Sequence, residues 1–507
     1  MPLTPKTAKQ KITKYWEAKK RLPDFLFLKE FEKKFPDGEV FLVGGAVRDI
    51  ILGKKDIIDF DFVIRNVPAK KLNEFIKEYG KINLVGKKFG VYKFVGKLAS
   101  LKEPIDIALP RTESSIKKSG AHRDFKISSD PSLPITADLS RRDFTINAMA
   151  YDVFAKKLID PFQGIADLAK KRIDTVGIPK RRFGEDLARI LRALRFSSEL
   201  DMTIEERVWK TIKSLAAKIN AKKKNEWIVP REVLAKELLK SFLANPVKAF
   251  DLYYESGLTK ILMPELLKMQ KCPQPKNYHT EGDVWTHARL ALSKLNGKEY
   301  KKFFPAKTAT ALVVMAVLFH DIAKPLTIKT PEKDGTDRIR FNNHDVIGGK
   351  VAEKIAKRLA LSSWNGGNVN PQKLSWLIEK HLLLVHGKVD EIANRTLEKY
   401  FLNPLLPGEE LLELFFADGA ATIPTNGKAD LTSLKKLLSR LKGLRLKIKS
   451  TGAAKNIING HDIMKEYKLK PGPQIGELLE KVREEHLSGK IKTKKEALSL
   501  VKRVLSK

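Results

Sequence analysis

The sequence predicts a multidomain protein in which an α+β unit, a mixed β-sheet with helices, is followed by an all-α remainder. β-rich runs broken by glycines are confined to residues 38–155, and they are Val40–Val43, Ile57–Ile64, Val91–Val95 and Ile105–Leu109. From about residue 165, apolar side chains instead recur at helical spacing, as in Leu187, Ile190, Leu191 and Leu194. The chain of 507 residues also exceeds one domain, since ~150 residues per domain is typical.

Five segments are expected in chain order. A basic lead helix precedes the α+β head, in which Lys70–Tyr79 is helical and residues 120–140 form a polar loop. A helical neck, a second helical domain and a basic helical tail follow. The expected boundaries are 1–35, 36–165, 166–270, 271–425 and 426–507. Residues 431–507 contain 20 basic and 7 acidic side chains, which makes this end the most basic domain-sized piece.

The composition excludes several classes of protein. The 97 Lys and Arg residues against 60 Asp and Glu give a net charge of +37, which favours a polyanionic partner over a solubilising lysine coat. Cys272 is the single cysteine, so a disulfide framework and a Cys-based zinc finger are excluded. The longest apolar run, Ala311–Phe319, is about half of the ~20 residues that cross a bilayer, so we expect no membrane segment. The N-terminus resembles no signal peptide, and the expected location is the reducing cytoplasm.

Two carboxylates stand on one predicted strand of the head. Because side chains alternate along a strand, Asp59 and Asp61 share one face. The residues predicted to point into the core are Ile58, Phe60, Phe62 and Ile64. Paired carboxylates repel each other unless a cation joins them, and Mg²⁺ prefers oxygen ligands. Asp106, alone on the polar face of PIDIAL, is the candidate third acid of a two-metal phosphoryl-transfer site; the alternative is a solvated strand face.

A glycine turn lies fourteen residues before these acids, in GGAVRD (44–49). Gly44 and Gly45 allow backbone amides to approach a triphosphate, and Arg48 can bind phosphate oxygens. GGAVRD followed by DFD resembles the signature of the class II polymerase-beta-like nucleotidyltransferases. That branch holds CCA-adding enzymes, their C-only and A-only relatives, and bacterial poly(A) polymerases. The family's later motifs are resembled, in order, by RRDFTINAMA (141–150), DPFQGIADL (160–168) and EDLARILRALRF (185–196).

The resemblance implies roles for individual residues. It assigns two Mg²⁺ ions to the catalytic acids Asp59 and Asp61, with Asp106 as the third carboxylate. The residues expected to bind the nucleotide are Gly44, Gly45, Arg48, Arg142, Asp143, Asn147, Asp186, Arg189 and Arg192.

Asp186 and Arg189 also have a chemical interpretation of their own. On a helix, positions i and i+3 share a face, so a carboxylate would lie beside a guanidinium. Cytosine and adenine both present an amino group beside an acceptor, and both match such a pair. Uracil and guanine would place a carbonyl against the carboxylate and leave buried polar groups unpaired, at ~1–3 kcal/mol each. The pair could therefore select C and A without a nucleic-acid template; the alternative is an intrahelical salt bridge.

Histidines and aspartates recur in the second helical domain. In chain order they are His287, His320, Asp321, His344, His381 and Asp418. Imidazole with carboxylate suits Mn, Fe, Ni, Zn or Mg, and a bound metal could activate water. The order H…HD…H…H…D resembles the HD phosphohydrolase superfamily, and the HD domain fused behind the transferase in many bacterial tRNA nucleotidyltransferases. The alternative is that these histidines cap helices or fill a core.

The resemblance as a whole implies an enzyme that adds C, C and A to the 3′ end of tRNA from CTP and ATP, with release of pyrophosphate. The basic tail would hold the tRNA body, and no obligate protein partner is expected. A poly(A) polymerase, or an enzyme that adds only C or only A, would have the same motifs. From another class, the chain could be an HD phosphohydrolase whose transferase-like half binds RNA. The paired Asp59 and Asp61 argue against that alternative, since a binding module has no use for two adjacent unpaired carboxylates.

Overall fold

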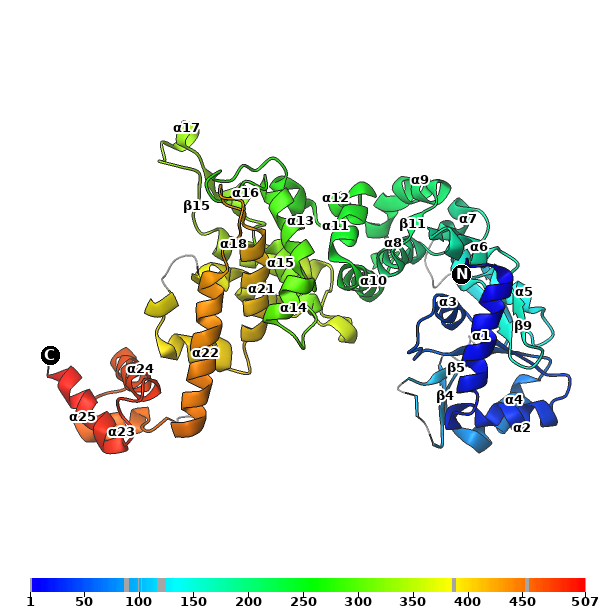
Figure 1. Cartoon of the computed structure of the whole chain (residues 1–507), viewed down its shortest axis with the longest axis horizontal. Helices are drawn as coiled ribbons and strands as arrows, with labels where there is room; N and C mark the ends of the chain where they lie inside the picture. The colour runs from blue at the N-terminus through cyan, green and yellow to red at the C-terminus, as the bar shows by residue number, and fades with distance from the viewer. Residues whose placement is uncertain are drawn as a thin grey trace. The chain divides into compact units, whose positions relative to one another are not determined.

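The computed structural model describes residues 2–85, 91–98, 100–101, 103–115, 125–384, 389–451 and 456–506. The chain forms two compact units, Met1–Leu262 and Met263–Lys507, and each is described by itself (Figure 1). The first unit contains the sheet, and the second is almost entirely helical. The predicted order of an α+β head followed by helices is thereby confirmed. Within the described residues, no helix has the length and apolarity needed to span a bilayer.

A mixed sheet is the framework of the first unit. Among the described residues it has seven strands in the order β3-β4-β5-β2-β1-β8-β9. The central pair β2 and β5 is parallel, and the other neighbours are antiparallel. The strand bounds are β1 Glu39–Val43, β2 Asp61–Arg65, β3 Gly80–Val85, β4 Val91–Gly96, β5 Ile105–Ala108, β8 Ala150–Asp152 and β9 Lys157–Ile159. Strands β6 (Arg111–Ser115) and β7 (Phe125–Ser129) form a separate hairpin.

The lead segment forms two helices where one was predicted. These are α1 (Pro5–Lys19) and α2 (Leu26–Lys34), joined by a 3₁₀ turn at Pro23–Phe25. The side chain of Thr4 caps α1, and the buried face of α1 consists of Ala8, Ile12 and Trp16. Helix α2 packs beside α4 (Ala69–Tyr79), as Figure 1 shows, and α1 packs on α3 (Gly45–Ile51). The predicted loop at 120–140 is partly ordered structure, because β7 and α5 (Ile135–Ser140) fall inside it; residues 120–124 lie outside the described residues.

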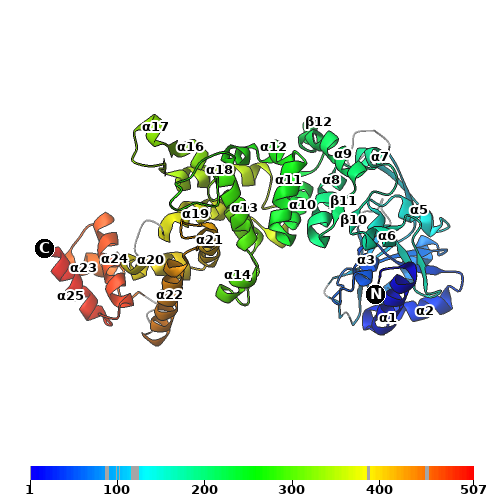
Figure 2. The ribbon, with the colours of Figure 1, turned by 45° about the horizontal axis from the view of Figure 1, so that its top comes forward.

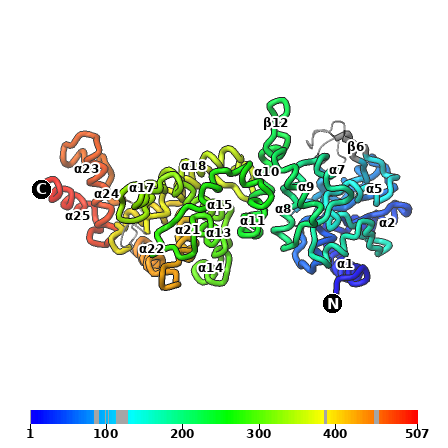
Figure 3. The backbone as a smooth tube through the Cα atoms, turned by 90° about the horizontal axis from the view of Figure 1, so that it is seen from above, coloured from blue at the N-terminus to red at the C-terminus, as the bar shows by residue number. Residues whose placement is uncertain are grey.

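Helices complete the first unit beyond the sheet. The central helix α8 is buried along much of its length and packs on α10, while α11 packs on both; α10 and α11 run side by side in Figure 2. A hairpin of β12 and β13 stands out from these helices in Figure 3. The bounds are α6 Gly164–Ala169, β10 Arg172–Ile173, α7 Pro179–Glu185, α8 Ala188–Leu200, β11 Thr203–Ile204, α9 Glu206–Leu215, β12 Lys222–Lys223, β13 Glu226–Trp227, α10 Arg231–Ala244, α11 Pro246–Glu255 and α12 Leu258–Leu262.

The second unit is built around one apolar helix, α15 (Ala311–Phe319), in which every residue is buried. It packs against α13, α19 and α21, and α13 and α21 lie beside it in Figure 1. Cys272, the buried free thiol, precedes this bundle. The other bounds are α13 Val284–Lys294, α14 Lys298–Phe303, α16 Lys324–Thr327, β14 Ile328–Lys329, α17 Pro331–Asp334, β15 Arg340–Phe341, α18 His344–Arg358, α19 Pro371–Lys380, α20 Asn394–Leu397 and α21 Gly408–Ala421.

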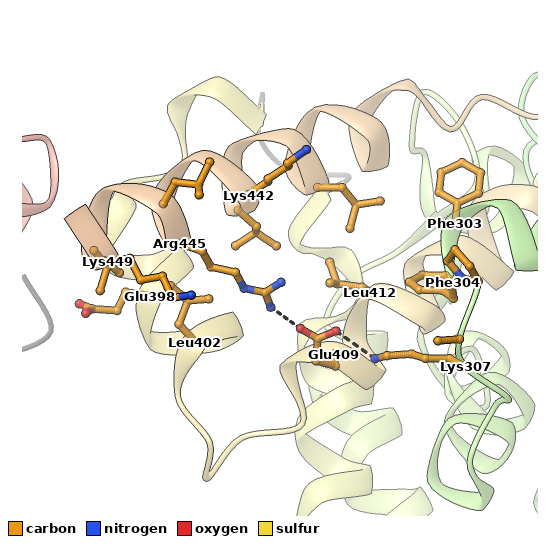
Figure 4. Close-up of a pocket in the computed structure, with 16 residues that line it drawn as sticks. Phe303, Phe304, Lys307, Glu398, Leu402, Glu409, Leu412, Lys442, Arg445 and Lys449 are labelled. Carbon is orange, nitrogen blue, oxygen red and sulfur yellow. Dashed lines mark hydrogen bonds and ion pairs between the residues drawn. The ribbon is translucent and has the colours of Figure 1, made fainter. Parts of the chain in front are cut away.

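Four helices end the chain: α22 Thr432–Thr451, α23 Gly460–Tyr467, α24 Pro473–Leu487 and α25 Lys494–Leu505. The last three share an apolar core that includes Ile463, Val482 and Val501, and they lie together in Figure 3. Helix α22 packs on α21 and borders a pocket of about 830 Å³. In Figure 4, Arg445 and Lys307 both reach Glu409 at this pocket. The ion pair between Arg445 and Glu409 joins α22 to α21.

Candidate active sites

The predicted carboxylates meet where the parallel strands β2 and β5 lie side by side. Asp61 is directly opposite Asp106 in the strand register, and the amide of Asp106 donates to the carbonyl of Phe60 across 3.0 Å. Phe60 is buried and Asp59 is exposed, as alternation requires. The prediction that Ile58 points into the core is wrong, because its side chain is 50% exposed. Strand β2 begins only at Asp61, so the regular alternation does not extend back to Ile58.

The charges of this cluster favour a cation. Burial, together with repulsion from the neighbouring Asp59 carboxylate, raises the pKa of Asp61 to about 6. Burial, followed by repulsion from Asp106, also raises the pKa of Asp59. Sequence reasoning missed Lys93, which lies opposite Asp106 on β4 and donates from Nζ to its Oδ1 across 2.8 Å. Three carboxylates with one lysine retain net negative charge, which suits oxygen-liganded Mg²⁺.

Gly44 is required by its surroundings. Its φ of +72° lies in the left-handed region, and a Cβ there would stand 2.7 Å from Nη1 of Arg142 and 3.4 Å from Oδ2 of Asp61. A side chain at position 44 would therefore displace the guanidinium of Arg142 and would touch the carboxylate of Asp61. Gly45 follows as the first residue of α3.

Four of the predicted nucleotide-binding residues, Arg48, Asp143, Asn147 and Arg192, form one hydrogen-bonded network. Arg48 donates from Nη1 to Oδ1 of Asn147 across 2.7 Å, and Asn147 in turn donates to Asp143 across 3.3 Å. Arg192 grips Asp143 with Nε and Nη2, at 2.7 and 2.6 Å. Burial opposes ionisation of Asp143, but the Arg192 guanidinium outweighs it and lowers the pKa to about 2. Arg48, Arg192 and Arg195 also lie over the ring of Phe196. In this structure Arg48 and Arg192 thus fix neighbouring side chains.

Asp186 and Arg189 occupy a geometry that differs from the one predicted. Helix α7 ends at Glu185 and α8 begins at Ala188, so Asp186 lies in the connection, with extended backbone. Its carboxylate accepts from the amide of Ala188 at 2.9 Å. Arg189 donates from Nη1 to Glu185 at 2.7 Å and to the carbonyl of Arg182 at 2.9 Å. The prediction that Asp186 and Arg189 share one face of a helix is therefore wrong. Only Arg189 lies in α8, and Asp186 lies two residues before that helix.

The histidines and aspartates of the second unit converge from five elements. His287 (α13) lies with Nε2 3.1 Å from Oδ1 of Asp418 (α21) and 3.3 Å from Nε2 of His320, which follows α15. Asp321 is the hub, and its carboxylate lies within 4.0 Å of His287 and of each of the other three histidines. The six predicted residues, His287, His320, Asp321, His344, His381 and Asp418, are thus brought to one place.

Three of these imidazoles are held in one tautomer. The Nδ1 atoms of His320, His344 and His381 donate to the carbonyls of Val317, Phe341 and Ile378. This leaves each Nε2 as the metal-binding atom and turns it toward Asp321. Nε2 of His344 is buried and finds no hydrogen-bond partner among the described residues. A buried acceptor of this kind fits a metal ion, and four imidazoles with two carboxylates suit a divalent transition metal or Mg²⁺.

Sequence reasoning missed two residues that support this cluster. Glu281 accepts from Nδ1 of His287 at 2.8 Å and from Nδ1 of His279 at 2.7 Å. Lys324 lies with Nζ 2.7 Å from Oδ2 of Asp321 and donates to Gln274 across 2.8 Å. Burial would lower the pKa of His287, but the carboxylates of Asp418 and Glu281 raise it to about 9. The spacing HDIAK, with Lys324 three residues after Asp321, was the signal available for the lysine.

Comparison with known families agrees with both sites. Residues 40–174 match the poly A polymerase head domain, and residues 283–418 match the HD domain. Residues 420–501 match a domain described as a putative tRNA nucleotidyltransferase domain 2. The fold and the two sites therefore define a nucleotidyltransferase of the poly(A) polymerase type with a fused HD domain.

Curated relatives define the family further. The multifunctional CCA protein of Stenotrophomonas maltophilia (strain R551-3) is 30% identical over 366 residues, which cover 71% of this chain and 79% of that protein. The multifunctional CCA protein of Neisseria gonorrhoeae (strain NCCP11945) is 32% identical over 324 residues, 63% of this chain and 69% of that protein. The chain belongs to this family of CCA-adding tRNA nucleotidyltransferases.

A solved structure shares the fold over nearly the whole chain. The crystal structure of the Bacillus stearothermophilus CCA-adding enzyme in complex with CTP superposes with a TM-score of 0.61 at 21% identity. The likeness covers 95% of this chain and 96% of that one. The likeness shows that both chains share the same succession of a head and helical parts.

Proposed function

We propose that this chain completes tRNA 3′ ends by adding C, C and A from CTP and ATP without a nucleic-acid template. The observation that supports it best is that Asp61 lies directly opposite Asp106 on the neighbouring strand. Asp59 lies two residues before Asp61, and the guanidinium of Arg142 lies near the Asp61 carboxylate at Gly44. The family's poly(A) polymerases, and its members that add only C or only A, would use the same residues. The proposal also assigns the segments 1–35, 36–165, 166–270, 271–425 and 426–507 as lead, head, neck, HD domain and tRNA-binding tail.

In the reaction, the 3′ oxygen of the tRNA attacks the α-phosphorus of the nucleotide, a P–O bond forms, and pyrophosphate leaves. Asp59, Asp61 and Asp106 would hold two Mg²⁺ ions, which when bound supply Lewis acidity at the attacking and leaving oxygens. Arg142 lies near Asp61, and we assign it to the triphosphate, whose oxygens a guanidinium can bind. Lys93, close to the same carboxylates, is a further cation for leaving phosphate oxygens.

Asp186 and Arg189 are proposed to read the base. One carboxylate oxygen of Asp186 accepts a hydrogen bond from the amide of Ala188, which fixes the side chain. The other oxygen is the acceptor for the base. An amino group of cytosine or adenine suits that acceptor, and a carbonyl of uracil or guanine does not. We place this reaction in the cytoplasm, with the tRNA 3′ end, CTP and ATP as partners and with no membrane or obligate protein partner.

Extension with single nucleotides tests the proposal. Three tRNA transcripts, ending before CCA, after C and after CC, are offered CTP, ATP or both, and the products are sequenced. Addition of two C from CTP alone, and of one A after CC, is the expected result. Long A tails would assign a poly(A) polymerase, and addition of one base type would assign a C-only or A-only enzyme. Absence of extension from all three transcripts would reject the proposal.

A second activity is favoured by the cluster around Asp321. We propose metal-dependent hydrolysis of phosphoesters there, with Mn, Ni, Fe or Mg held by the six converging residues. The supporting observation is the common orientation of the three Nε2 atoms whose Nδ1 partners are backbone carbonyls. Metal-dependent turnover of 2′,3′-cyclic and monoester phosphates by wild type, and its loss in His344→Ala, would support it. Turnover that persists in His344→Ala would assign the hydrolysis to a contaminant.

A further inference from the structure

The lead segment, residues 5–34, lies outside the matched head domain at 40–174, yet two of its rings pack against Phe60 and Phe62, beside the predicted carboxylates. Trp16 of α1 and Phe25 of the following turn are 2% and 1% exposed. Their rings lie 5.3 Å apart and form one cluster. Burial of this degree in a segment beyond the family domain calls for a reason within the head.

The partners of these rings are the residues that alternate with the catalytic aspartates. The ring of Phe25 lies 5.1 Å from that of Phe60 and 6.0 Å from that of Phe62, both edge-on. Trp16 lies edge-on to Phe62 at 5.9 Å. Since Phe60 lies between Asp59 and Asp61 in the chain, a backbone shift that follows from loss of its ring contacts would move both carboxylates.

Polar contacts attach the same segment to the other parts of the site. Buried Asp24 accepts from the amide of Ser100 at 2.9 Å, in the connection that leads into the Asp106 strand. Lys11 donates from Nζ to the carbonyl of Ile51 at 2.8 Å, at the end of the helix that starts at Gly45. The lead segment therefore contacts the Asp59–Asp61 strand, the approach to Asp106 and the helix of the glycine turn.

We propose that Trp16 and Phe25 are positioning residues of the transferase site, which hold Asp59 and Asp61 at the spacing that metal and nucleotide require. The inference rests on the proposed nucleotidyltransferase function. Carboxylates that share metal ions need their positions fixed to a fraction of an ångström, and a displacement of ~1 Å can cost ~100-fold in rate. The rings touch neither substrate nor metal and act through Phe60 and Phe62.

The test compares Trp16→Ala and Phe25→Ala with Phe31→Ala. Phe31 is a matched control, because it is equally buried in the lead segment but packs on Phe35, Phe75 and Phe154. The readouts are kcat for CTP addition, the Mg²⁺ concentration at half-maximal rate, and the Kd for CTP with Mg²⁺ by calorimetry. A mere loss of folded protein lowers the rate in proportion to the active fraction, but leaves the half-maximal Mg²⁺ concentration unchanged.

Trp16→Ala and Phe25→Ala are expected to raise the half-maximal Mg²⁺ concentration ~10-fold and to lower kcat ~10–100-fold, while Phe31→Ala changes neither more than ~2-fold. Trp16→Phe should restore most of both values. Equal Mg²⁺ dependence in Trp16→Ala, Phe31→Ala and wild type would overturn the inference. If the alanine variants do not fold, Trp16→Leu and Phe25→Leu make the same comparison with less lost volume. Inactive wild-type protein would reject the proposed function instead, and Mg²⁺-dependent CTP binding would still test the positioning role.

Discussion

The transferase site and the HD site differ in the charges that surround their aspartates. At the transferase site, Asp61 lies opposite Asp106 on the adjacent strand, and burial together with the Asp59 carboxylate raises the pKa of Asp61 to about 6 despite the nearby Arg142 and Lys93. At the HD site, imidazoles and Lys324 surround Asp321, whose pKa they hold well below its usual range against the effect of burial. Asp59 is exposed, whereas His287, His320 and His381 are buried. An open acidic site suits a polymer end with a nucleotide triphosphate, and a closed imidazole site suits one tightly held metal ion.

The largest expected effect is a double dissociation between the sites. Asp61→Asn should lower nucleotide addition roughly 1,000-fold and leave phosphoester hydrolysis intact, because one shared metal-binding carboxylate is removed. Asp321→Asn should do the reverse. Initial rates of CTP addition and of cyclic-phosphate hydrolysis are measured for both proteins. Asp201→Asn, at an exposed surface ion pair with Lys248, serves as control. Loss of both activities in either variant would mean that the sites are coupled.

A smaller effect is expected from the support of His287. Glu281→Gln removes the carboxylate that accepts from Nδ1 of His287, and a group that orients a metal-binding histidine in this way is worth about 10–100-fold in metal affinity. Mn²⁺ affinity by calorimetry should fall by that factor, while CTP addition stays at the wild-type rate. Glu265→Gln, which loses an ion pair with Arg358 elsewhere in the second unit, is the matched control. Unchanged Mn²⁺ affinity in Glu281→Gln would remove Glu281 from the site.

The stability that the charge of Asp143 contributes should depend on pH. The folded pKa of Asp143 is about 2, below the unfolded value, so its charge stabilises the protein fully above about pH 4. That contribution, about 2 kcal/mol, is lost as the pH falls from about 4 to 2. The difference in unfolding free energy between wild type and Asp143→Asn should therefore be constant from pH 5 to 7 and shrink below pH 4. A constant difference down to pH 2 contradicts the role of Arg192 in holding the charge.

The smallest effect concerns base selection. Asp186→Asn keeps an oxygen for the amide of Ala188 and replaces the remaining acceptor with a donor. The ratio of CTP to UTP incorporation should fall about 10-fold, as expected for one mispaired buried group. Competition between the two nucleotides on a tRNA lacking CCA measures this ratio. Glu185→Gln, at the neighbouring residue that pairs with Arg189, tests whether the change belongs to Asp186. An unchanged ratio of CTP to UTP incorporation in Asp186→Asn would contradict the base-reading role of Asp186.

Alternation and chain order made much of the architecture predictable. Strand periodicity correctly predicted that Phe60 is buried between the two less buried residues Asp59 and Asp61. It overextended the strand to Ile58, because the point where pairing begins depends on the neighbouring strands β1 and β5. The helix assumed through Asp186 was wrong for a similar reason, since α7 ends one residue earlier. Local pattern indicates the type of an element more reliably than its ends.

The supporting groups of both sites could not be predicted because their contacts span distant parts of the chain. Lys93 meets Asp106 only through the pairing of β4 with β5. Glu281 joins His287 to the amide of Ile423, 142 residues away. Trp16 and Phe25 reach Phe62 and Phe60 across some forty residues of sequence. Such contacts depend on which elements pack together, and that information is absent from any short pattern.

The single cysteine has a practical consequence for chemical labelling. Cys272 is 6% exposed, and burial raises its pKa to about 11 from an ordinary value near 9, so its thiolate population falls roughly 100-fold. A maleimide dye should therefore react only slowly with the thiol of Cys272. A cysteine introduced at exposed Lys224 or Leu405 would react alone, and each compact unit could receive its own fluorophore without prior removal of Cys272.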